Sequence, residues 1–403
     1  MMKAAQNENK IRVMTASEFK TKIREGKIPA IDEIDAVTCG TFGIMSGTIA
    51  VFSFQATEAG VFGKAKSVFF NGVPTVIGPC PNENNGFIDL IVLGTAVSKD
   101  SEKYGGGRLF KDLVLRRAIL AEIETDNDSF TKTLTIDDFN TARIILTRGA
   151  FKNYTAFVNV SDESVSTIFS VRPLKGESEE ATVSGCGEIN PLQNDPFLKH
   201  HKPGTFVLIN GAPGIIIGTG TRSTKDKPNL SAAADMFEMN PDLMGGFVTA
   251  KGAECLTSVA SVIPITDTET YAALQITDEK ISLPIIDVSS RRIVAETTYA
   301  AVWKGVDAEI SVSPEKCNRC GECAAAAFCP TGAISDSCIV SDECVFCLSC
   351  TSACPNGVFT ADGGSLFVNG KTVPIRLRQS DRRRGEKAAS LLKSEIEFGR
   401  WVI

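Results

Sequence analysis

Histidine is nearly absent from this chain, which has only His200 and His201 among its 403 residues. Acid–base catalysis by imidazole and histidine-ligated zinc sites both need histidines spread over the fold, and two adjacent ones in a Lys-Pro-Gly loop leave little room for either. Aromatic residues are also scarce, at 7%, whereas 34 glycines indicate many tight turns and close approaches of the backbone. The chemistry must therefore depend on other side chains.

Long apolar runs are missing as well. The longest, residues 87–97, contains Asp89 and Gly94 and falls far short of the roughly 20 residues that a membrane-spanning helix needs. The first eleven residues are polar and mixed in charge, without the apolar core of a secretion signal. A net charge of −6 argues against nucleic-acid binding by the chain as a whole. We expect a cytoplasmic protein with neither a membrane nor a nucleic-acid partner.

Cysteine is the residue type that stands out. There are 13, and nine of them lie between positions 317 and 354. A chain without a secretion signal is not expected in an oxidising compartment, so these thiols are interpreted as ligands and not as disulfides.

The clustered cysteines form two runs that each end in Cys-Pro. The runs are Cys317, Cys320, Cys323 and Cys329, then Cys344, Cys347, Cys350 and Cys354. This is the two-cluster bacterial ferredoxin pattern, in which the fourth cysteine of each run binds the other cluster. It predicts two [4Fe-4S] clusters, one on Cys317, Cys320, Cys323 and Cys354 and the other on Cys344, Cys347, Cys350 and Cys329. A zinc-binding cysteine module is the alternative, but eight interleaved thiolates fit two cubanes better than closed tetrahedral zinc sites.

Two details of these runs bear on the cluster environment. The first run has five residues before its Cys-Pro instead of three, which we expect to alter the surroundings of the second cluster without abolishing it. The ninth thiol, Cys338, lies between the runs and is interpreted as a small buried residue and not a ligand.

Size and periodicity predict an α+β (mixed α/β) protein, with a strand-rich large domain plus a ferredoxin-like dicluster domain. We expect domains at 1–308 and 309–362, and a C-terminal hairpin and helix at 363–403. Helical patterns with start signals appear at 15–25, 135–148 and 231–239, and Asn369-Gly370 predicts a hairpin turn before a closing helix at 381–398. Apolar β-branched runs predict strands at 67–70, 75–78, 87–94, 156–160, 206–210, 214–218 and 259–263.

Four segments rich in glycine and small residues, 38–48, 78–83, 184–196 and 218–223, mark candidate sites, and three of them contain a cysteine. A cysteine beside Gly or Pro sits where backbone N–H groups can face the sulfur, which lowers the thiol pKa and lets a thiolate or persulfide persist. Cys186 and Cys80 fit this description best. Cys39 and Cys255 fit the alternative of small buried residues equally well.

Two arginines follow glycines and could hold an anionic substrate. Arg108 follows three glycines, and Arg222 lies in Gly-Thr-Gly-Thr-Arg-Ser. Such a pattern can present backbone donors and a guanidinium to a carboxylate or phosphate. The alternative is a turn with a surface arginine. Neither segment has the spacing of a Walker A or Rossmann motif.

The segments 35–43, 78–83, 184–196 and 218–223, followed by the two cysteine runs, resemble the methanogenesis marker protein 16 family over nearly the whole chain. That family is a branch of the homocysteine-biosynthesis, sulfur-incorporation superfamily, whose characterised activity is that of aspartate semialdehyde sulfurtransferase. The resemblance implies an anaerobic archaeal protein. The homocysteine-forming branch has Met-Cys-Ser-Ser-Gly where this chain has Met45-Ser46-Gly47, so that cysteine is missing here.

The residues and the resemblance together predict a sulfurtransferase in which a cysteine persulfide gives its sulfur to a small aldehyde such as aspartate semialdehyde. The two clusters would supply electrons for reduction of the carbonyl carbon. The predicted catalytic residues are Cys186, Cys80 and Glu188, with Glu83 as another proton donor, and the predicted substrate-binding residues are Arg108, Arg222, Asn190 and Asp195. A sulfur donor and an external electron donor protein are the expected partners.

Two alternatives remain open. In the first, the protein is an electron-transfer or maturation partner in the assembly of a methanogenic cofactor or metalloenzyme, and turns over no small molecule. In the second, Cys80 and Cys186 jointly bind a further metal, although two thiolates without a nearby histidine make an incomplete site. The basic segment 376–403, with a net charge of +4, is interpreted as a solvated face or a clamp on the acidic cysteine-rich region.

Overall fold

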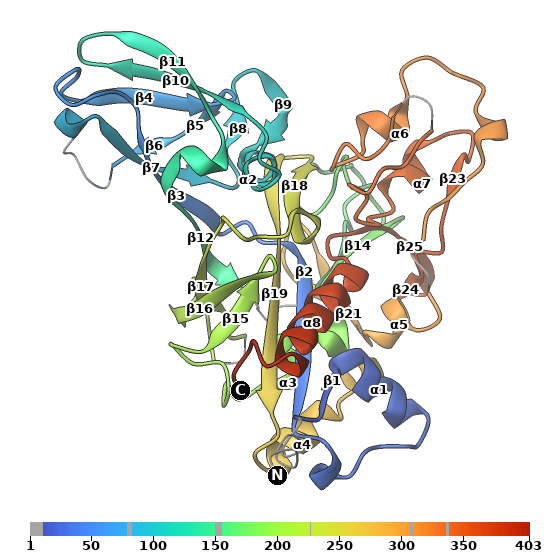
Figure 1. Cartoon of the computed structure of the whole chain (residues 1–403). Coiled ribbons are helices and arrows are strands. Elements are labelled where there is room, and N and C mark those ends of the chain that lie inside the picture. Colours follow the sequence, from blue (N-terminus) through green and yellow to red (C-terminus); the bar gives the residue numbers. More distant parts are fainter. Residues whose placement is uncertain (1–10, 79–82, 150–154, 226, 307–308, 336–337) are drawn as a thin grey trace, which may run out of the picture.

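A computed structural model describes residues 11–78, 83–149, 155–225, 227–306, 309–335 and 338–403. Helices and sheets both contribute, which confirms the α+β class (Figure 1). Within the described residues there are sheets of eleven, four and six strands and two small strand pairs, β8 (Val97–Ser98) with β9 (Ser101–Gly105) and β22 (Ser311–Val312) with β23 (Phe359–Thr360). None of the helices in these ranges is long and apolar enough to cross a membrane.

The eleven-stranded sheet runs through the middle of the molecule. Two of its strands, β2 (Ala36–Ile44) and β19 (Gly252–Pro264), pair antiparallel, and almost every residue of both is buried. Such continuous burial requires cover on both faces of the sheet. The other strands are β1 (Val13–Thr15), β15 (Phe206–Ile209), β16 (Ala212–Thr219), β17 (Leu230–Asp235), β12 (Phe139–Gly149), β3 (Thr48–Gln55), β7 (Phe87–Leu93), β6 (Val76–Ile77) and β18 (Met244–Thr249).

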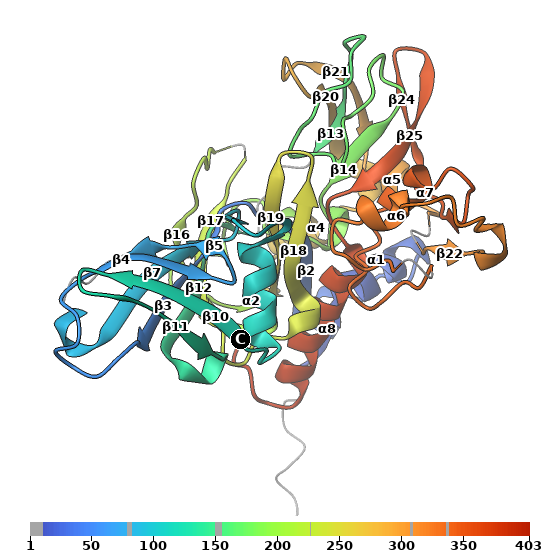
Figure 2. The same ribbon diagram turned by 90° about the horizontal axis from the view of Figure 1, so that it is seen from above.

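The four-stranded sheet packs on the far end of the central sheet and closes the main hydrophobic core. Phe52, Phe54, Phe70 and Phe139 form the centre of this core, and the ring centroids of neighbouring pairs are 5.0 to 6.0 Å apart. The strands of the four-stranded sheet are β4 (Ala65–Phe70), β5 (Val73–Pro74), β10 (Ile119–Thr125) and β11 (Ser129–Leu134). Figure 2 shows this sheet and the six-stranded sheet on opposite sides of the β18–β19 hairpin.

The six-stranded sheet joins parts of the chain that are far apart in sequence. Parallel pairing of β14 with β25 adds the C-terminal hairpin to strands of the large domain. The hairpin turns at Asn369 and Gly370, both with positive φ, as predicted. The strands are β13 (Thr155–Val158), β14 (Ala181–Ser184), β20 (Ser282–Asp287), β21 (Ile293–Thr298), β24 (Ser365–Val368) and β25 (Lys371–Arg378).

The closing helix α8 (Arg382–Glu397) confirms the predicted C-terminal helix and lies across β2 and β19 (Figure 1). Asp381 caps it by accepting hydrogen bonds from the backbone N–H groups of Arg383 and Arg384. The helix approaches the sheet very closely, because a Cβ atom at Gly40 would lie 2.0 Å from the carbonyl oxygen of Gly385. Glycine at position 40 therefore allows this short distance between α8 and the central sheet.

The remaining helices are short. They are α1 (Ala16–Arg24), α2 (Gly106–Val114), α3 (Pro191–Asn194), α4 (Thr268–Leu274), α5 (Ala300–Trp303), α6 (Ala324–Ala327) and α7 (Ser349–Ala353). The predicted helix at 15–25 is confirmed as α1, with a capping box between Thr15 and Glu18. The cysteine-rich region forms loops around α6 and α7 beside the six-stranded sheet (Figure 2).

Two helix predictions are wrong. Residues 135–148 begin with one turn of 3₁₀ helix at Ile136–Asp138 and continue as strand β12, and residues 231–239 contain strand β17. In β12, Ala142, Ile144 and Leu146 alternate with more exposed residues, so the apolar period is two and not 3.6. The N-terminal signal at Thr135 is real, but it caps only that single turn.

Candidate functional site

Three of the four small-residue segments meet at one cavity of about 770 Å³, named here the arginine cavity. Ser46, Gly185, Asn190 and Arg222 represent these three segments in its wall. Asn190 also caps α3, since its side chain accepts a hydrogen bond from the N–H of Leu192 at 2.9 Å. The cavity therefore brings together two of the predicted substrate-binding residues, Arg222 and Asn190.

The wall of the arginine cavity carries four basic side chains, Arg148, Arg222, Lys227 and Arg291. Burial, and then the charge of Arg222, lower the pKa of Arg148. The guanidinium of Arg291 lies over the ring of Phe169, 4.9 Å from its centroid, which helps to hold it in place. Sequence reasoning found only Arg222, since the other three follow no glycine motif.

Glu254, on β19, is the one acidic residue that lines the arginine cavity among the described residues. It is 5% exposed, and its Oε2 atom has no hydrogen-bond partner within the described chain. Burial raises its pKa, although a hydrogen bond with Ser46 acts in the opposite direction. Burial therefore shifts the proton equilibrium of this carboxyl group toward the protonated form, relative to an exposed glutamate, and a protonated carboxyl group can donate a proton.

A second cavity of about 890 Å³, the interdomain cavity, lies between the large domain and the cysteine-rich region. Glu254 lines it too, together with Tyr104, Arg108, Cys323 and Cys329. Glu254 therefore belongs to the walls of both cavities. This places a titratable group between the arginine cavity and the cysteines.

Arg108, the other predicted substrate-binding arginine, faces this interdomain cavity and not the arginine cavity. Its guanidinium lies 3.4 Å from Glu343 and 3.7 Å from Asp112, and it donates to the carbonyl of Thr331 at 3.5 Å. These contacts join α2 to the cysteine-rich region.

The cysteines of the two runs line two further cavities. One, a small cavity, contains Cys329, Cys344, Cys347 and Cys350. The other, of about 250 Å³, contains Cys317, Cys320, Cys323, Cys354 and also Cys338. In each cavity the fourth cysteine of one run joins three of the other run, which is the division that the ferredoxin spacing predicts.

A single metal ion and a multinuclear cluster require different arrangements of their thiolates. A single Zn²⁺ needs its thiolates about 2.3 Å from one point. In the described ranges, no three His, Cys, Asp or Glu side chains are grouped closely enough to hold one metal ion. A four-iron cluster instead holds its thiolates at separate corners. The N–H of Ala333 donates to Cys329 Sγ at 3.2 Å, a contact of the kind that tunes cluster potentials.

The described cysteines of the large domain are all fully buried. Burial raises the pKa of Cys39 and Cys255 to about 12 and that of Cys186 to about 11. The Cys186 thiol donates to the carbonyl of Phe42 at 3.5 Å. At neutral pH these groups are therefore protonated thiols. Cys80, the second predicted nucleophile, lies outside the described residues.

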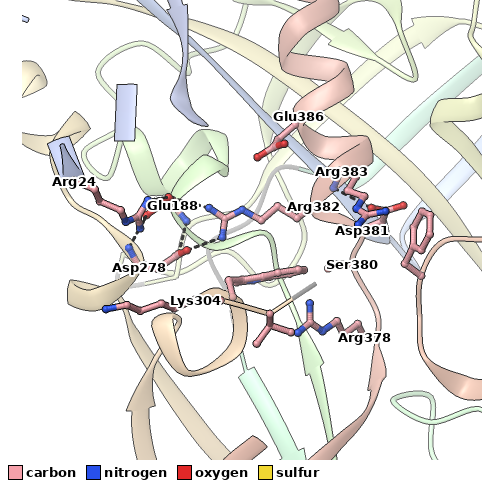
Figure 3. Close-up of a pocket in the computed structure, with 14 residues that line it drawn as sticks. Arg24, Glu188, Asp278, Lys304, Arg378, Ser380, Asp381, Arg382, Arg383 and Glu386 are labelled. Atoms are coloured by element: carbon pink, nitrogen blue, oxygen red, sulfur yellow. Dashed lines mark hydrogen bonds and ion pairs between the residues drawn. The ribbon is translucent and has the colours of Figure 1, made fainter. Parts of the chain in front are cut away.

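Glu188, a predicted proton donor, lies in a third cavity of about 390 Å³ (Figure 3). Its carboxylate accepts from Arg24 at 2.6 and 2.8 Å and from Arg382 at 2.9 Å. Burial alone would raise its pKa, but these two guanidinium groups outweigh it and lower the pKa. Glu188 is thus held as a carboxylate that accepts hydrogen bonds and ties α1 to α8. For Glu83, the structure describes only the backbone.

Asp195, the last predicted substrate-binding residue, belongs to a buried network that the sequence did not reveal. Its Oδ2 lies 2.8 Å from His201 Nδ1, and His201 Nε2 lies 2.6 Å from Ser261 Oγ. This is the arrangement of a Ser-His-Asp triad. All three residues are at most 4% exposed, and none of them lines a cavity described above. The network holds the 195–201 loop against β19.

A family model described as "Homocysteine biosynthesis enzyme, sulfur-incorporation" matches residues 11–403 of this chain. An uncharacterized protein of Methanothermobacter thermautotrophicus is 42% identical over 398 residues, which cover 98% of this chain and 92% of that protein. An uncharacterized protein of Methanocaldococcus jannaschii is 40% identical over 400 residues, which cover 98% of this chain and all of that protein.

The L-aspartate semialdehyde sulfurtransferase of Methanocaldococcus jannaschii is a more distant relative. It is 27% identical over 317 residues, which cover 73% of this chain and 60% of that protein. No solved structure matches this chain.

Proposed function

We propose that this protein transfers sulfur to a small carbonyl compound bound in the arginine cavity. The reason is that the chain belongs to the family described as "Homocysteine biosynthesis enzyme, sulfur-incorporation". The observation that carries this proposal is the meeting of three small-residue segments in one cavity whose wall includes Arg222. Within the described residues Arg222 has no acidic partner, so its guanidinium is free to bind a substrate carboxylate. The name of the sulfurtransferase relative supports the reaction class.

The proposed reaction has two steps. Hydrogen sulfide condenses with the aldehyde carbonyl and water leaves, which gives a thioaldehyde. Two electrons and two protons then convert the thioaldehyde to a thiol. Glu254 supplies a proton to the departing oxygen, since this residue lines the cavity and burial shifts its carboxyl group toward the protonated form.

Sulfur reaches the cavity from an external donor, and Cys186 is the proposed carrier of the persulfide. Its neighbour Gly185 lines the arginine cavity. Release of sulfide from a persulfide consumes two further electrons and two protons. Since the Cys186 thiol is buried, loading requires the loop at 185–187 to open. Positive φ at Gly185 and Gly187 makes this loop a turn that glycine alone adopts readily.

We further propose that the eight cysteines of the two runs hold two [4Fe-4S] clusters, as the division of the cysteines between two cavities supports. Such clusters would supply the electrons of the reduction, one each, from an external electron donor protein. Cys323 and Cys329 line the interdomain cavity together with Glu254. The proposed clusters and the arginine cavity would therefore be connected through this cavity.

The proposal is tested by an anaerobic assay with reduced protein, sulfide or a persulfide donor, and aspartate semialdehyde. We expect homocysteine to form, and Cys186→Ala to abolish its formation from the persulfide donor while iron content is unchanged. If neither donor gives any thiol with aspartate semialdehyde or other small aldehydes, although both clusters are present and accept electrons, sulfur transfer is refuted.

One observation favours a second function. The three described cysteines of the large domain are buried thiols, so none is poised as a nucleophile. An electron-transfer or maturation partner would need only the cysteines of the two runs. Reduction of the clusters followed by electron delivery to a partner metalloenzyme, without thiol formation, would support this reading.

A further inference from the structure

We infer that the two groups of four cysteines act in series, with a one-electron carrier protein docking on the loop at 318–322 beside the first group, and the second group facing the large domain. The inference rests on the proposed function, because it gives an order to the two clusters proposed there. The surface group is Cys317, Cys320, Cys323 and Cys354, and the buried group is Cys329, Cys344, Cys347 and Cys350.

The surface group lies at the outside of the molecule. Cys320 is exposed, and so is every residue of the loop at 318–322. In the described ranges, the hydrophobic cluster around this group contains only residues between 310 and 359, all from the cysteine-rich region itself. Electron-transfer encounters between proteins bury little surface, so an exposed loop of this size is sufficient for a carrier protein to dock.

The buried group is packed against the large domain. Cys347 is 9% exposed and belongs to one hydrophobic cluster with Phe42 of β2 and Leu256 of β19. The backbone N–H of Arg378 on β25 donates to the carbonyl of Cys347 at 3.0 Å. Helix α7, which carries Cys350, lies beside β25 (Figure 2). Because these contacts cover the buried group, a carrier protein can approach the surface group more closely.

Phe42 connects the buried group with the thiol proposed to carry the persulfide. Its side chain shares a hydrophobic cluster with Cys347, and its carbonyl accepts from the Cys186 thiol at 3.5 Å. Its neighbours on β2, Thr41 and Gly43, line the arginine cavity. The buried group is therefore the one in contact with the strand where electrons are needed.

The two groups also lie next to each other. Cys350 of the buried group belongs to the hydrophobic cluster against which Cys317, Cys323 and Cys354 of the surface group pack. Each encounter would move one electron from the reduced carrier, which is oxidised, to the protein, which is reduced, without forming a bond or moving a proton. Two encounters supply the two electrons that release of sulfide from a persulfide consumes.

Stopped-flow reduction of the anaerobic holoprotein by a reduced bacterial-type ferredoxin tests the inference, with dithionite as a small reductant for comparison. Cys320→Ser and Cys344→Ser form a matched pair, because each removes a ligand from one group only. We expect ferredoxin to reduce Cys344→Ser as fast as wild type, and Cys320→Ser at least about ten-fold more slowly. Dithionite should reduce both variants. Iron analysis and electron paramagnetic resonance identify the cluster that each variant retains.

A second pair of variants keeps all eight ligands, and decides the matter if a ligand variant does not fold. Lys316 is exposed and precedes Cys317, whereas Lys371 is exposed at the turn of the β24–β25 hairpin. With an acidic ferredoxin at low salt, Lys316→Glu should slow reduction at least about three-fold, and the control Lys371→Glu should leave the rate unchanged.

Equal rates in the two cysteine variants, faster reduction of Cys320→Ser than of Cys344→Ser, no reduction of wild type by ferredoxin, or equal effects of the two lysine substitutions would overturn the inference. None of these measurements contains an aldehyde. The expected rates without thiol formation from any aldehyde would refute the proposed sulfur transfer alone. Thiol formation together with any of the overturning rates would refute this inference alone.

Discussion

At the scale of single residues, the structure separates charged groups that hold the fold from groups that can react. Glu188 and Asp195 both occur in a segment that the sequence marks as functional, yet each is held by hydrogen bonds to charged or ring nitrogen partners, Arg24 and Arg382 for Glu188 and His201 for Asp195. Glu254 belongs to none of the sequence motifs, and only the folded structure reveals that this residue lines two cavities. Local sequence can indicate a cysteine or glycine turn, but it cannot show which carboxyl group is left without partners.

Glu254→Gln should stabilise the protein at pH 8. Because burial raises the pKa of Glu254, folding disfavours its ionised form, and this cost is present above the ordinary pKa of glutamate and absent well below it. Glutamine removes the cost, so the gain in unfolding free energy should be larger at pH 8 than at pH 5. Urea unfolding at both pH values measures it, and an equal effect at both would contradict the assignment.

Asp195→Asn should destabilise the protein by about 3 kcal/mol or more, because it removes a buried carboxylate that accepts from three backbone N–H groups and His201. Although burial opposes it, these partners lower the pKa of Asp195 to about 2. The stabilisation is therefore present above about pH 4 and lost as the pH falls towards 2. Denaturant titration of wild type and variant checks it. A variant as stable as wild type at pH 7 would show that the network contributes nothing.

At the scale of elements, sequence patterns succeeded where the signal is local. Thr15 and Glu18 cap α1, and Asn369-Gly370 forms the hairpin turn, because both features depend on residues within four positions of each other. The patterns failed at β12 and β17, where pairing with distant strands decides the structure. The sequence therefore predicts many elements, but not the order of the eleven strands that brings residues 46, 185 and 222 to one cavity.

The contact between α8 and β2 gives a prediction at this scale. Gly40→Ala should lower the unfolding free energy by about 1–3 kcal/mol or more, because the added methyl group would overlap the carbonyl of Gly385. Gly245→Ala is the matched control, since its nearest neighbour would be a flexible carbon of Lys111 at 3.6 Å. Thermal unfolding of both variants measures the difference. Similar melting temperatures would show that α8 can move away without cost.

At the scale of the whole molecule, hydrogen bonds and an ion pair connect the cysteine-rich region to the rest of the protein. The backbone N–H of Arg378 on β25 donates to the carbonyl of Cys347, and Lys111 on α2 bonds Glu343 at 2.8 Å. The position of Glu254 and the cysteines around one interdomain cavity follows from these contacts. If this region holds the proposed clusters, contacts of this kind would let them serve chemistry inside the same chain.

The two-cluster assignment makes a prediction about the metal content of the whole protein. Wild type should contain about eight iron atoms, and Cys320→Ser about four, because this substitution removes a ligand of one cluster only. Cys338→Ser is the control, since Cys338 lines the same cavity but is not assigned as a ligand. Iron analysis and electron paramagnetic resonance of the reduced proteins distinguish the variants. Loss of iron in Cys338→Ser to the extent of Cys320→Ser would overturn the ligand assignment.

The most direct test of the account follows labelled sulfur. Reduced holoprotein would be incubated anaerobically with ³⁵S-sulfide and a panel of small aldehydes that includes aspartate semialdehyde. The account predicts a labelled thiol that depends on reductant, falls at least about ten-fold in Arg222→Gln and is unchanged in the control Arg116→Gln. Arg116 is an exposed arginine that pairs with Asp137 outside the arginine cavity. Absence of label from every carbonyl compound, with clusters intact and reduced, would contradict sulfur transfer in the arginine cavity.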